Sequence, residues 1–424
     1  MKVVTARSVE SVGSAWEQAD FRRLFRASAI SVFGSEIGEL ALPLLAIITL
    51  SVTPEELGLL RTLQFLPFLV ATLPLGALVD GRPKRSLMMK ADVGRFILIG
   101  AIPATVWLGI AELELVYVVV FAAGCLTVLY QLADFAYLPV LVREELIVDA
   151  NSKLSAVHSA NEIAGKGIGG VIVQALTAPF AVLFDAATYL VSALDLWRIR
   201  TPEQPPRVNQ PGSIFRGALS GLVAAWRHRY IRPLLLEATT FNFFNEIFLL
   251  SLLLHAVRDL ELHAAAIGLV FVGGGVGSFV GAWFGPRLTE RFGYGRVLVT
   301  TMAIGNGAPL AAALARTDSP NSLAILVATF GVMGLGIGIA NVHAVSLRQT
   351  SVGEHVRGRI NAGYRLVSWG ALAVGATVGG LLAASLGAYQ AMMIGAIGIP
   401  LATAWVALSP IPQLETVIEA GRDT

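Results

Sequence analysis

Long apolar stretches separated by short polar segments dominate the chain. A helix that crosses a membrane needs ~20 mostly apolar residues. Twelve segments meet this requirement, at approximately 25–50, 56–79, 86–110, 114–142, 152–178, 179–199, 232–257, 263–286, 295–315, 321–347, 357–385 and 387–409. The links 111–114, 177–179 and 385–387 are so short that each predicts a tight turn between antiparallel neighbours. The pattern predicts an all-α integral membrane protein with twelve transmembrane helices.

The composition agrees with this pattern. The 424 residues are 55% hydrophobic and only 14% charged, with a mean hydropathy of +0.69. A soluble domain carries roughly 25% charged residues, so this chain has too few charges to cover a soluble surface. Its single cysteine, Cys125, excludes an internal disulfide and a cysteine-based metal site. The first 19 residues are polar, and we expect no signal peptide.

Lysine and arginine residues predict the orientation, because they concentrate in cytoplasmic loops. If both termini are cytoplasmic, 27 of the 31 basic residues, Arg95 among them, lie on the cytoplasmic side. Arg258 and Arg316 then lie outside, and Arg61 and Lys166 lie within or near spans. We therefore expect a multi-pass protein of the inner (plasma) membrane with both termini in the cytoplasm.

The segment 200–231 is the one long loop, and it divides the chain. It begins with a Pro-rich polar stretch and continues with apolar residues at helical spacing among arginines. These are Phe215, Leu219, Leu222, Val223 and Trp226, with Arg216, Arg227 and Arg229. The pattern favours an amphipathic helix on the inner membrane surface, although a plain tether is compatible with it. The predicted domains are an N-terminal six-helix half (1–199), this cytoplasmic linker (200–231) and a C-terminal half (232–424).

An internal repeat relates the two halves. A shift of 210 residues places Glu36 on Glu246 and Gly58 on Gly268. The same shift places Asp80 on Glu290, Asn151 on Asn361, and Gly165, Gly169 and Gly170 on Gly375, Gly379 and Gly380. We interpret the last six as glycines that allow close helix packing. Two parallel repeats are a recurrent transporter plan, with the substrate site between the halves near mid-membrane.

The loop after the second span has the sequence Gly76-Ala-Leu-Val-Asp80-Gly-Arg82-Pro-Lys84-Arg85. With the twelve spans and two parallel halves, it resembles the major facilitator superfamily over nearly the whole chain. Gly81 and Pro83 depart from the family pattern, whereas 290–293 match it more cleanly. In that family the loop latches the halves on the cytoplasmic side. The resemblance therefore assigns a conformational latch to Gly76, Asp80, Arg82, Lys84, Arg85, Glu290 and Arg291.

The segments 21–25 and 357–359 resemble the drug and macrolide exporter branch. Exporters often carry Gly-Pro-two residues-Gly-Gly in span five, and here Lys166 replaces the proline. Span four lacks the membrane arginine of many proton-driven members and offers Asp134, which is a candidate latch partner or proton site. Asp185 resembles an acidic position common in this branch, and a structural role for it is equally compatible.

Charged residues inside a membrane are functional candidates, because each costs on the order of 2.5–3.5 kcal/mol. Glu36 follows Arg26 by ten residues, which places it ~15 Å deep. We predict that Glu36 and its repeat mate Glu246 line a central cavity and that one or both take up a proton. A structural hydrogen bond is the alternative for each. The polar stripes of the same two spans include Glu39, Asn242 and Asn245.

Span five carries His158, Glu162 and Lys166 at four-residue steps, which places them on one helix face. A glutamate four residues before a lysine favours a salt bridge between the two. We interpret Glu162 and Lys166 as a substrate or proton site, with a silent, self-neutralised pair as the alternative. His158 is expected to make a polar contact rather than to bind a metal.

The remaining motifs favour transport over enzymatic chemistry. The glycine clusters at 273–277 and 331–338 lie inside spans and lack the Gly-Lys-Ser/Thr of a nucleotide loop. We expect no enzyme activity, cofactor, metal or nucleic-acid partner. We expect a monomeric secondary transporter that exports amphipathic drugs or natural products in exchange for protons by alternating access, with membrane lipids around it. The alternatives are an uptake symporter or lipid transporter on the same fold, or a non-transporting receptor or scaffold.

Overall fold

The computed structural model describes residues 14–203, 212–317 and 319–419, without the side chains of 212–219 and 354–357, and all regular secondary structure in these ranges is helical. The first seven helices are α1 (Ala19–Leu44), α2 (Pro54–Val70), α3 (Thr72–Asp80), α4 (Lys84–Trp107), α5 (Leu113–Leu141), α6 (Ile147–Ala175) and α7 (Ala178–Trp197). The others are α8 (Gly212–Arg227), α9 (Ile231–Arg258), α10 (Ala264–Phe292), α11 (Tyr294–Gly307), α12 (Pro320–Thr350), α13 (Glu354–Leu386) and α14 (Ala388–Ala407).

Nine helices of the described part are long and apolar enough to cross a membrane. The number is ten when α2 and α3, which are bent by 48° at their junction, count as one span. Pro74 has no N–H to donate to the carbonyl of Val70, which accounts for a bend at this place. The 24-residue α4 and the 29-residue α6 carry more ionisable residues. The predicted count of twelve therefore stays a prediction.

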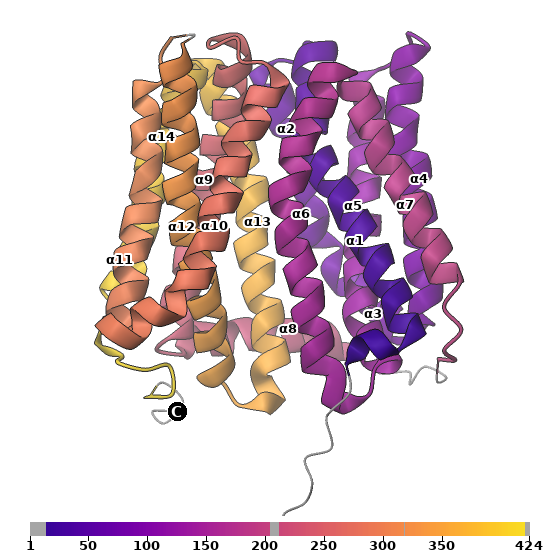
Figure 1. The fold of residues 1–424 in the computed structure, drawn as a ribbon, viewed down its shortest axis with the longest axis vertical. Coiled ribbons are helices and arrows are strands. Elements are labelled where there is room, and N and C mark those ends of the chain that lie inside the picture. Colours follow the sequence, from indigo (N-terminus) through magenta and orange to yellow (C-terminus); the bar gives the residue numbers. More distant parts are fainter. Residues whose placement is uncertain (1–13, 204–211, 318, 420–424) are drawn as a thin grey trace, which may run out of the picture.

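The same packing scheme occurs twice in the bundle. In the N-terminal half, α1 packs on α6 and α7, and α4 packs on α5 and α7. In the C-terminal half, α9 packs on α13 and α14, and α11 packs on α12 and α14. The halves contact each other through α2 against α13 and through α6 against α10, in the middle of Figure 1. The predicted all-helical membrane fold with two parallel repeats is confirmed.

Glycines allow the two contacts between the halves. A Cβ on Gly58 would lie 2.8 Å from the Cα of Gly380, and one on Gly170 would lie 2.9 Å from the Cα of Gly268. The 210-residue shift places Gly58 on Gly268 and Gly170 on Gly380, so the two contacts are equivalent in the repeat. The remaining predicted glycines pack within their halves, with Gly165 and Gly169 against Glu36 and Ile37, and Gly375 and Gly379 against Phe243 and Ile247. At these places a side chain would force the helices apart.

One end of the bundle carries α8. Figure 1 shows α8 crossing this end, where α1 begins and where the chain continues beyond α14. We call this end the α8 face and the opposite end the loop face. Val223 and Trp226 of α8 are exposed, whereas Ala225 is buried. The side chains of the predicted Phe215, Arg216 and Leu219 lie outside the described part.

The apolar cores show where the halves meet. Leu57 of α2, Leu250 of α9 and Ile267 of α10 belong to one core that spans both halves at the loop face. Nearer to α8, Tyr137 belongs to a core of the N-terminal half and Tyr230 to a separate core of the C-terminal half. The two halves are therefore packed together at the loop face and have distinct cores at the α8 face.

Candidate functional site

A cavity of about 740 Å³ lies in the N-terminal half and reaches α13. Six helices of that half contribute to its lining, and Trp369 and Leu372 of α13 complete it. The charged or ionisable residues in the lining are Glu36, Glu39, Arg95, His158, Glu162, Lys166 and Asp185. Aromatic rings lie among them, so the cavity offers both charged groups and apolar surface.

Lys166 of α6 pairs with α1, not with its own helix. Its Nζ lies 3.3 Å from Glu36 Oε2 and 3.4 Å from Glu39 Oε2. The predicted pair with Glu162 is wrong, since Glu162 lines the cavity without an ion pair in the described part of the chain. Two carboxylates one helical turn apart on α1 hold the ammonium more strongly than one carboxylate within α6.

Arg61 of α2 binds Glu246 of α9 across the boundary between the halves. Its Nε and one terminal nitrogen donate to the two carboxylate oxygens at 2.8 Å and 3.1 Å. The side chains are only 9% and 2% exposed. Glu246 was expected in the central cavity and is not among its lining residues. The arginine draws this carboxylate into the packed interface, where two hydrogen bonds compensate for lost water.

Sequence reasoning left Arg61 without a role. The sequence did indicate that Arg61 has a partner, because a lone arginine in an apolar span needs one. Its repeat mate is Phe271, so the repeat did not indicate where that partner lies.

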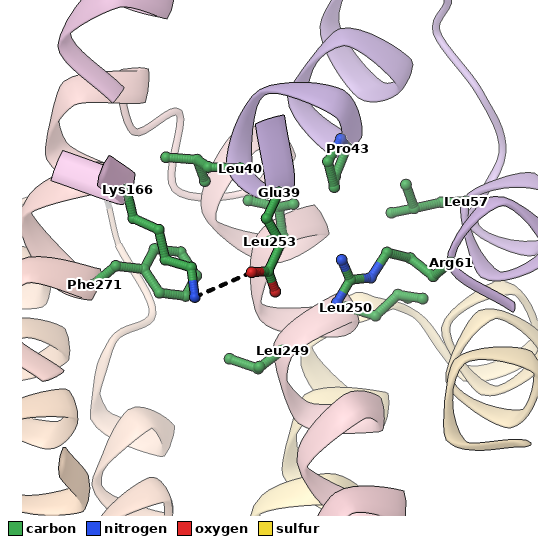
Figure 2. Close-up of a pocket in the computed structure, with 10 residues that line it drawn as sticks. All are labelled: Glu39, Leu40, Pro43, Leu57, Arg61, Lys166, Leu249, Leu250, Leu253 and Phe271. Atoms are coloured by element: carbon green, nitrogen blue, oxygen red, sulfur yellow. Dashed lines mark ion pairs between the residues drawn. The ribbon is translucent and has the colours of Figure 1, made fainter. Parts of the chain in front are cut away.

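A small cavity of about 60 Å³ connects the two ion-pair groups. Figure 2 shows Lys166 on one side of Glu39 and Arg61 on the other, with Phe271 and leucines of α9 around them. Arg61 and Glu39 both line this cavity. The acid–base network therefore contains Glu36, Lys166, Glu39, Arg61 and Glu246, which are three carboxylates and two cations. With every group ionised, it has one negative charge in excess.

Arg95 lies inside the N-terminal half, which corrects its expected place among the cytoplasmic charges. Its side chain is 4% exposed, pairs with Asp92 of the same helix and contributes to the 740 Å³ cavity. The guanidinium carbon lies 4.6 Å and 4.2 Å from the ring centroids of Tyr130 and Tyr189. The carboxylate and the two rings replace water around this buried cation.

Asp185 of α7 lies in the cavity wall against α1. A Cβ on Gly38 would lie 2.1 Å from Asp185 Oδ2, so a glycine at this place makes room for the carboxylate. Its Oδ1 is buried without a hydrogen-bond partner in the described structure. Asp185 thus lines the cavity with a carboxylate oxygen that has no described partner.

The other predicted polar residues have separate surroundings. Asp134 is absent from the lining of the 740 Å³ cavity, and its buried Oδ1 lacks a described hydrogen-bond partner. Asn242 donates to the Ser368 carbonyl at 2.7 Å, and the buried Oδ1 of Asn245 has no described partner. Residues 242, 245 and 246 therefore do not act as one stripe toward the central cavity. His158 contacts the Ser28 hydroxyl at 2.9 Å.

The predicted latch loop stays within its own half. Arg85 donates to the carbonyls of Leu196 and Trp197 at 2.9 Å and 2.6 Å, at the end of α7. Glu203 accepts hydrogen bonds from the backbone N–H groups of Lys84 and Arg85. Among the described residues, no ion pair joins Asp80 or Arg82 to the other half, or Glu290 or Arg291 to this one. The conformational latch therefore stays a prediction.

Comparisons with known proteins extend over the whole bundle. A family model described as "Transmembrane secretion effector" matches residues 11–423. The multidrug efflux pump Tap of Mycolicibacterium fortuitum is 24% identical over 369 residues, which is 84% of this chain and 87% of Tap. The niacin transporter NiaP of Acinetobacter baylyi is 32% identical over 169 residues, which is 39% of this chain and 36% of NiaP.

Among solved structures, a bacterial homologue of the iron transporter ferroportin in an inward-facing state superimposes with a TM-score of 0.73. The match covers 92% of this chain and 98% of that protein at 16% sequence identity. At this identity the likeness concerns the fold alone, and it agrees with the repeated helix packing described above.

Proposed function

Since this chain belongs to the transmembrane secretion effector family of the major facilitator superfamily, a superfamily of secondary transporters, we propose that it exports amphipathic molecules in exchange for protons. We also propose that the α8 face is cytoplasmic and that the protein lies in the bacterial inner membrane. The count of basic residues supports this orientation. The family match to a secretion model and the similarity to the efflux pump Tap favour export.

The observation that carries the proposal is the acid–base network. Three carboxylates face two cations: the Arg61–Glu246 pair is buried, and the other three side chains are 18% to 38% exposed. Uptake of one proton makes the network neutral, which a low-dielectric interior favours. Glu36 and Glu39 are the candidate proton carriers, because they line the 740 Å³ cavity, whereas Glu246 is held by Arg61.

The same network offers a coupling step. Loss of a proton leaves Glu36 and Glu39 both charged and strengthens their attraction to Lys166, whereas protonation of one of them weakens it. Lys166 lies four residues from Gly170, which contacts the C-terminal half at Gly268. A change in this pairing therefore acts on the helix that forms one of the two contacts between the halves.

The substrate would bind in the 740 Å³ cavity. Glu162 and Asp185 provide carboxylates that lack ion pairs in the described structure, and Phe65, Phe68 and Trp369 provide aromatic surface. Such a lining suits an amphipathic cation, because rings cover its apolar body and carboxylates neutralise its charge.

The test is ethidium uptake into everted membrane vesicles, which moves substrate in the export direction. A proton gradient, acidic inside, is expected to accelerate uptake by wild type. Glu36→Gln and Glu39→Gln are expected to remove the acceleration and to keep downhill ethidium movement. Glu114→Gln is the matched control, because Glu114 is exposed at the start of α5, away from the cavity. A rate of ethidium uptake by wild type that does not change with the proton gradient would contradict proton coupling.

Uptake is the second candidate function, since the similarity to the niacin transporter NiaP is to a transporter whose name specifies no secretion. That similarity covers about a third of each protein, so it carries less weight than the full-length family match. The same vesicles separate the two directions, since an uptake symporter would move its substrate with the proton and not against it. A lipid transporter would move a labelled lipid between leaflets, and a receptor or scaffold would move nothing under any gradient.

A further inference from the structure

A second cavity of about 350 Å³ lies in the C-terminal half, between α9, α11, α12 and α13. It includes none of the residues of the acid–base network. Amide and hydroxyl groups of Asn242, Asn306, Asn341 and Ser368 lie in its wall. Three ionisable side chains complete the polar lining, and they are Glu237, Arg348 and Arg365.

The two arginines lie at the border between this cavity and another one. Both also line a cavity of about 420 Å³ between α2 and α5 on one side and α12 and α13 on the other. The Arg348 guanidinium lies 4.0 Å from the Tyr364 ring centroid, and that of Arg365 lies 4.7 Å from the Trp369 ring centroid. Stacking of this kind fixes the planes of the guanidinium groups and leaves their edges available for hydrogen bonds.

The described structure leaves much of this hydrogen-bonding capacity unused. No carboxylate of the described residues lies within 4.0 Å of a guanidinium nitrogen of either arginine. Arg348 Nε is buried and has no described hydrogen-bond partner. Arg365 reaches Gln131 of the other half at 3.4 Å, which is long for a hydrogen bond.

The charge balance has the opposite sign to that of the acid–base network. Glu237 is the carboxylate of this cavity, and it forms no ion pair with either arginine in the described structure. Two guanidinium groups and one carboxylate leave one positive charge in excess. The excess positive charge attracts an anion, so the cavity favours a ligand with one negative charge.

We propose that this cavity is a subsite for the acidic group of a monoanionic amphiphile, with Arg348 and Arg365 as its ligands. A carboxylate or a phosphate ester matches the planar donor edges of the arginines. The apolar body of the ligand would lie beside Trp369 and extend toward Phe68 in the adjoining 420 Å³ cavity. A soluble substrate and an anionic phospholipid share this chemistry. The subsite goes beyond the proposed function, because it adds an anionic ligand class to the amphipathic cation that suits the 740 Å³ cavity, and only its role in turnover rests on that function.

The test is calorimetric titration of the full-length protein in phosphatidylcholine nanodiscs with 1-naphthoate and with the neutral 1-naphthamide. Wild type is expected to bind naphthoate at least about tenfold more tightly than naphthamide, because charge-assisted hydrogen bonds form only with the anion. Arg348→Gln and Arg365→Gln are expected to remove the preference and to leave naphthamide binding unchanged. Arg365→Lys, which keeps the charge and loses the planar fork, should retain part of it.

Two further variants separate this site from general effects of charge. Glu237→Gln is expected to strengthen naphthoate binding, since it removes the one carboxylate of the cavity. Arg287→Gln is the matched control, because Arg287 is an exposed arginine near the Trp283 ring and outside the cavity. It should bind both probes like wild type. Equal affinities of wild type for naphthoate and naphthamide, or arginine variants that keep the preference, would overturn the proposal.

Nanodiscs that contain phosphatidylglycerol distinguish the two sources of the anion. Competition between this lipid and naphthoate that requires Arg348 and Arg365 would identify a headgroup as an occupant, and absence of competition would identify a soluble anion. Binding is measured without transport, so the subsite and the export function can fail separately. Normal naphthoate binding with no proton-driven ethidium uptake would remove the export function alone.

Discussion

Arg61 and Glu246 form a two-hydrogen-bond ion pair between the halves, and the internal repeat does not duplicate it. Glu36, the repeat mate of Glu246, takes its cation from Lys166 of its own half. Phe271 occupies the position equivalent to Arg61 and lies 5.7 Å from the Lys166 ammonium. One acid of the repeated pair therefore joins the halves, and the other faces the cavity. This asymmetry gives two equivalent positions different tasks.

Removal of one partner of this pair is expected to destabilise the protein. Arg61→Gln leaves the Glu246 carboxylate buried without its cation, and such a change costs about 3–5 kcal/mol. The double variant Arg61→Leu/Glu246→Leu should recover much of the loss, since it leaves no buried charge. Thermal unfolding in detergent, followed by tryptophan fluorescence, measures both effects. A single variant as stable as wild type would show that the pair does not hold the halves together.

The glycine contact between α2 and α13 yields a second prediction. The added methyl group of Gly58→Ala would lie 2.8 Å from the Gly380 Cα, and backbone at that distance must move. We expect a loss of about 1–3 kcal/mol in stability and strongly reduced transport, because the loop face cannot close. Gly307→Ala is the matched control, since its Cβ would meet nothing within 4 Å. Equal behaviour of the two variants in unfolding and transport assays would contradict the assigned role of Gly58.

The environment of Arg95 predicts that lysine cannot replace it. Lysine keeps the positive charge but loses the planar group that lies between the rings of Tyr130 and Tyr189. We expect Arg95→Lys to lower stability by about 2–3 kcal/mol, as for other disrupted buried networks. Arg82→Lys, at an exposed loop position, should change it by less than ~0.5 kcal/mol. The comparison uses the same thermal unfolding measurement.

The sequence predicts spans well because apolar length is a local property. It also predicts which glycines pack closely, since the repeat pairs them at a constant offset. It does not predict which helices are neighbours, and the partner of Lys166 depends on that. The four-residue spacing indicated Glu162 as the ion-pair partner of Lys166, whereas the helix packing brings Glu36 and Glu39 to it. The place of Arg95 near the middle of α4, with 13 of the 24 residues of the helix at or beyond it, is hidden for the same reason, because positive charge near a predicted helix end suggests a loop.

Glu203 has a structural role that its position in a polar linker conceals. Its carboxylate accepts the N–H groups of Lys84 and Arg85 at 2.5 Å and 2.9 Å, where α4 begins after Pro83 without a side-chain cap. Glu203→Ala should therefore cost about 1 kcal/mol, as for the loss of an N-cap. Transport should persist, since the contact lies far from the cavity. Loss of transport without loss of stability would indicate that Glu203 acts in a latch instead.

The strongest test of the acid–base network compares Lys166 with Glu162. Lys166→Met removes the cation held by Glu36 and Glu39, so three carboxylates remain with Arg61 alone. We expect a loss of about 3 kcal/mol, because part of the buried charge is left without a partner. Glu162→Gln, one turn away on the same helix, should change stability by less than ~0.5 kcal/mol, because Glu162 makes no ion pair in the described structure.

A second substitution then identifies the group that Lys166 neutralises. If Glu36 and Glu39 carry the excess charge, Lys166→Met/Glu36→Gln should be more stable than Lys166→Met, because it removes one of the unpaired carboxylates. Lys166→Met/Glu162→Gln should show no such recovery. With Glu36→Gln added, these variants and wild type form two double-mutant cycles that thermal unfolding can measure. Recovery with Glu162→Gln instead would place the ion pair within α6, as its four-residue spacing alone suggests, and would remove Glu36 and Glu39 from the proton pathway.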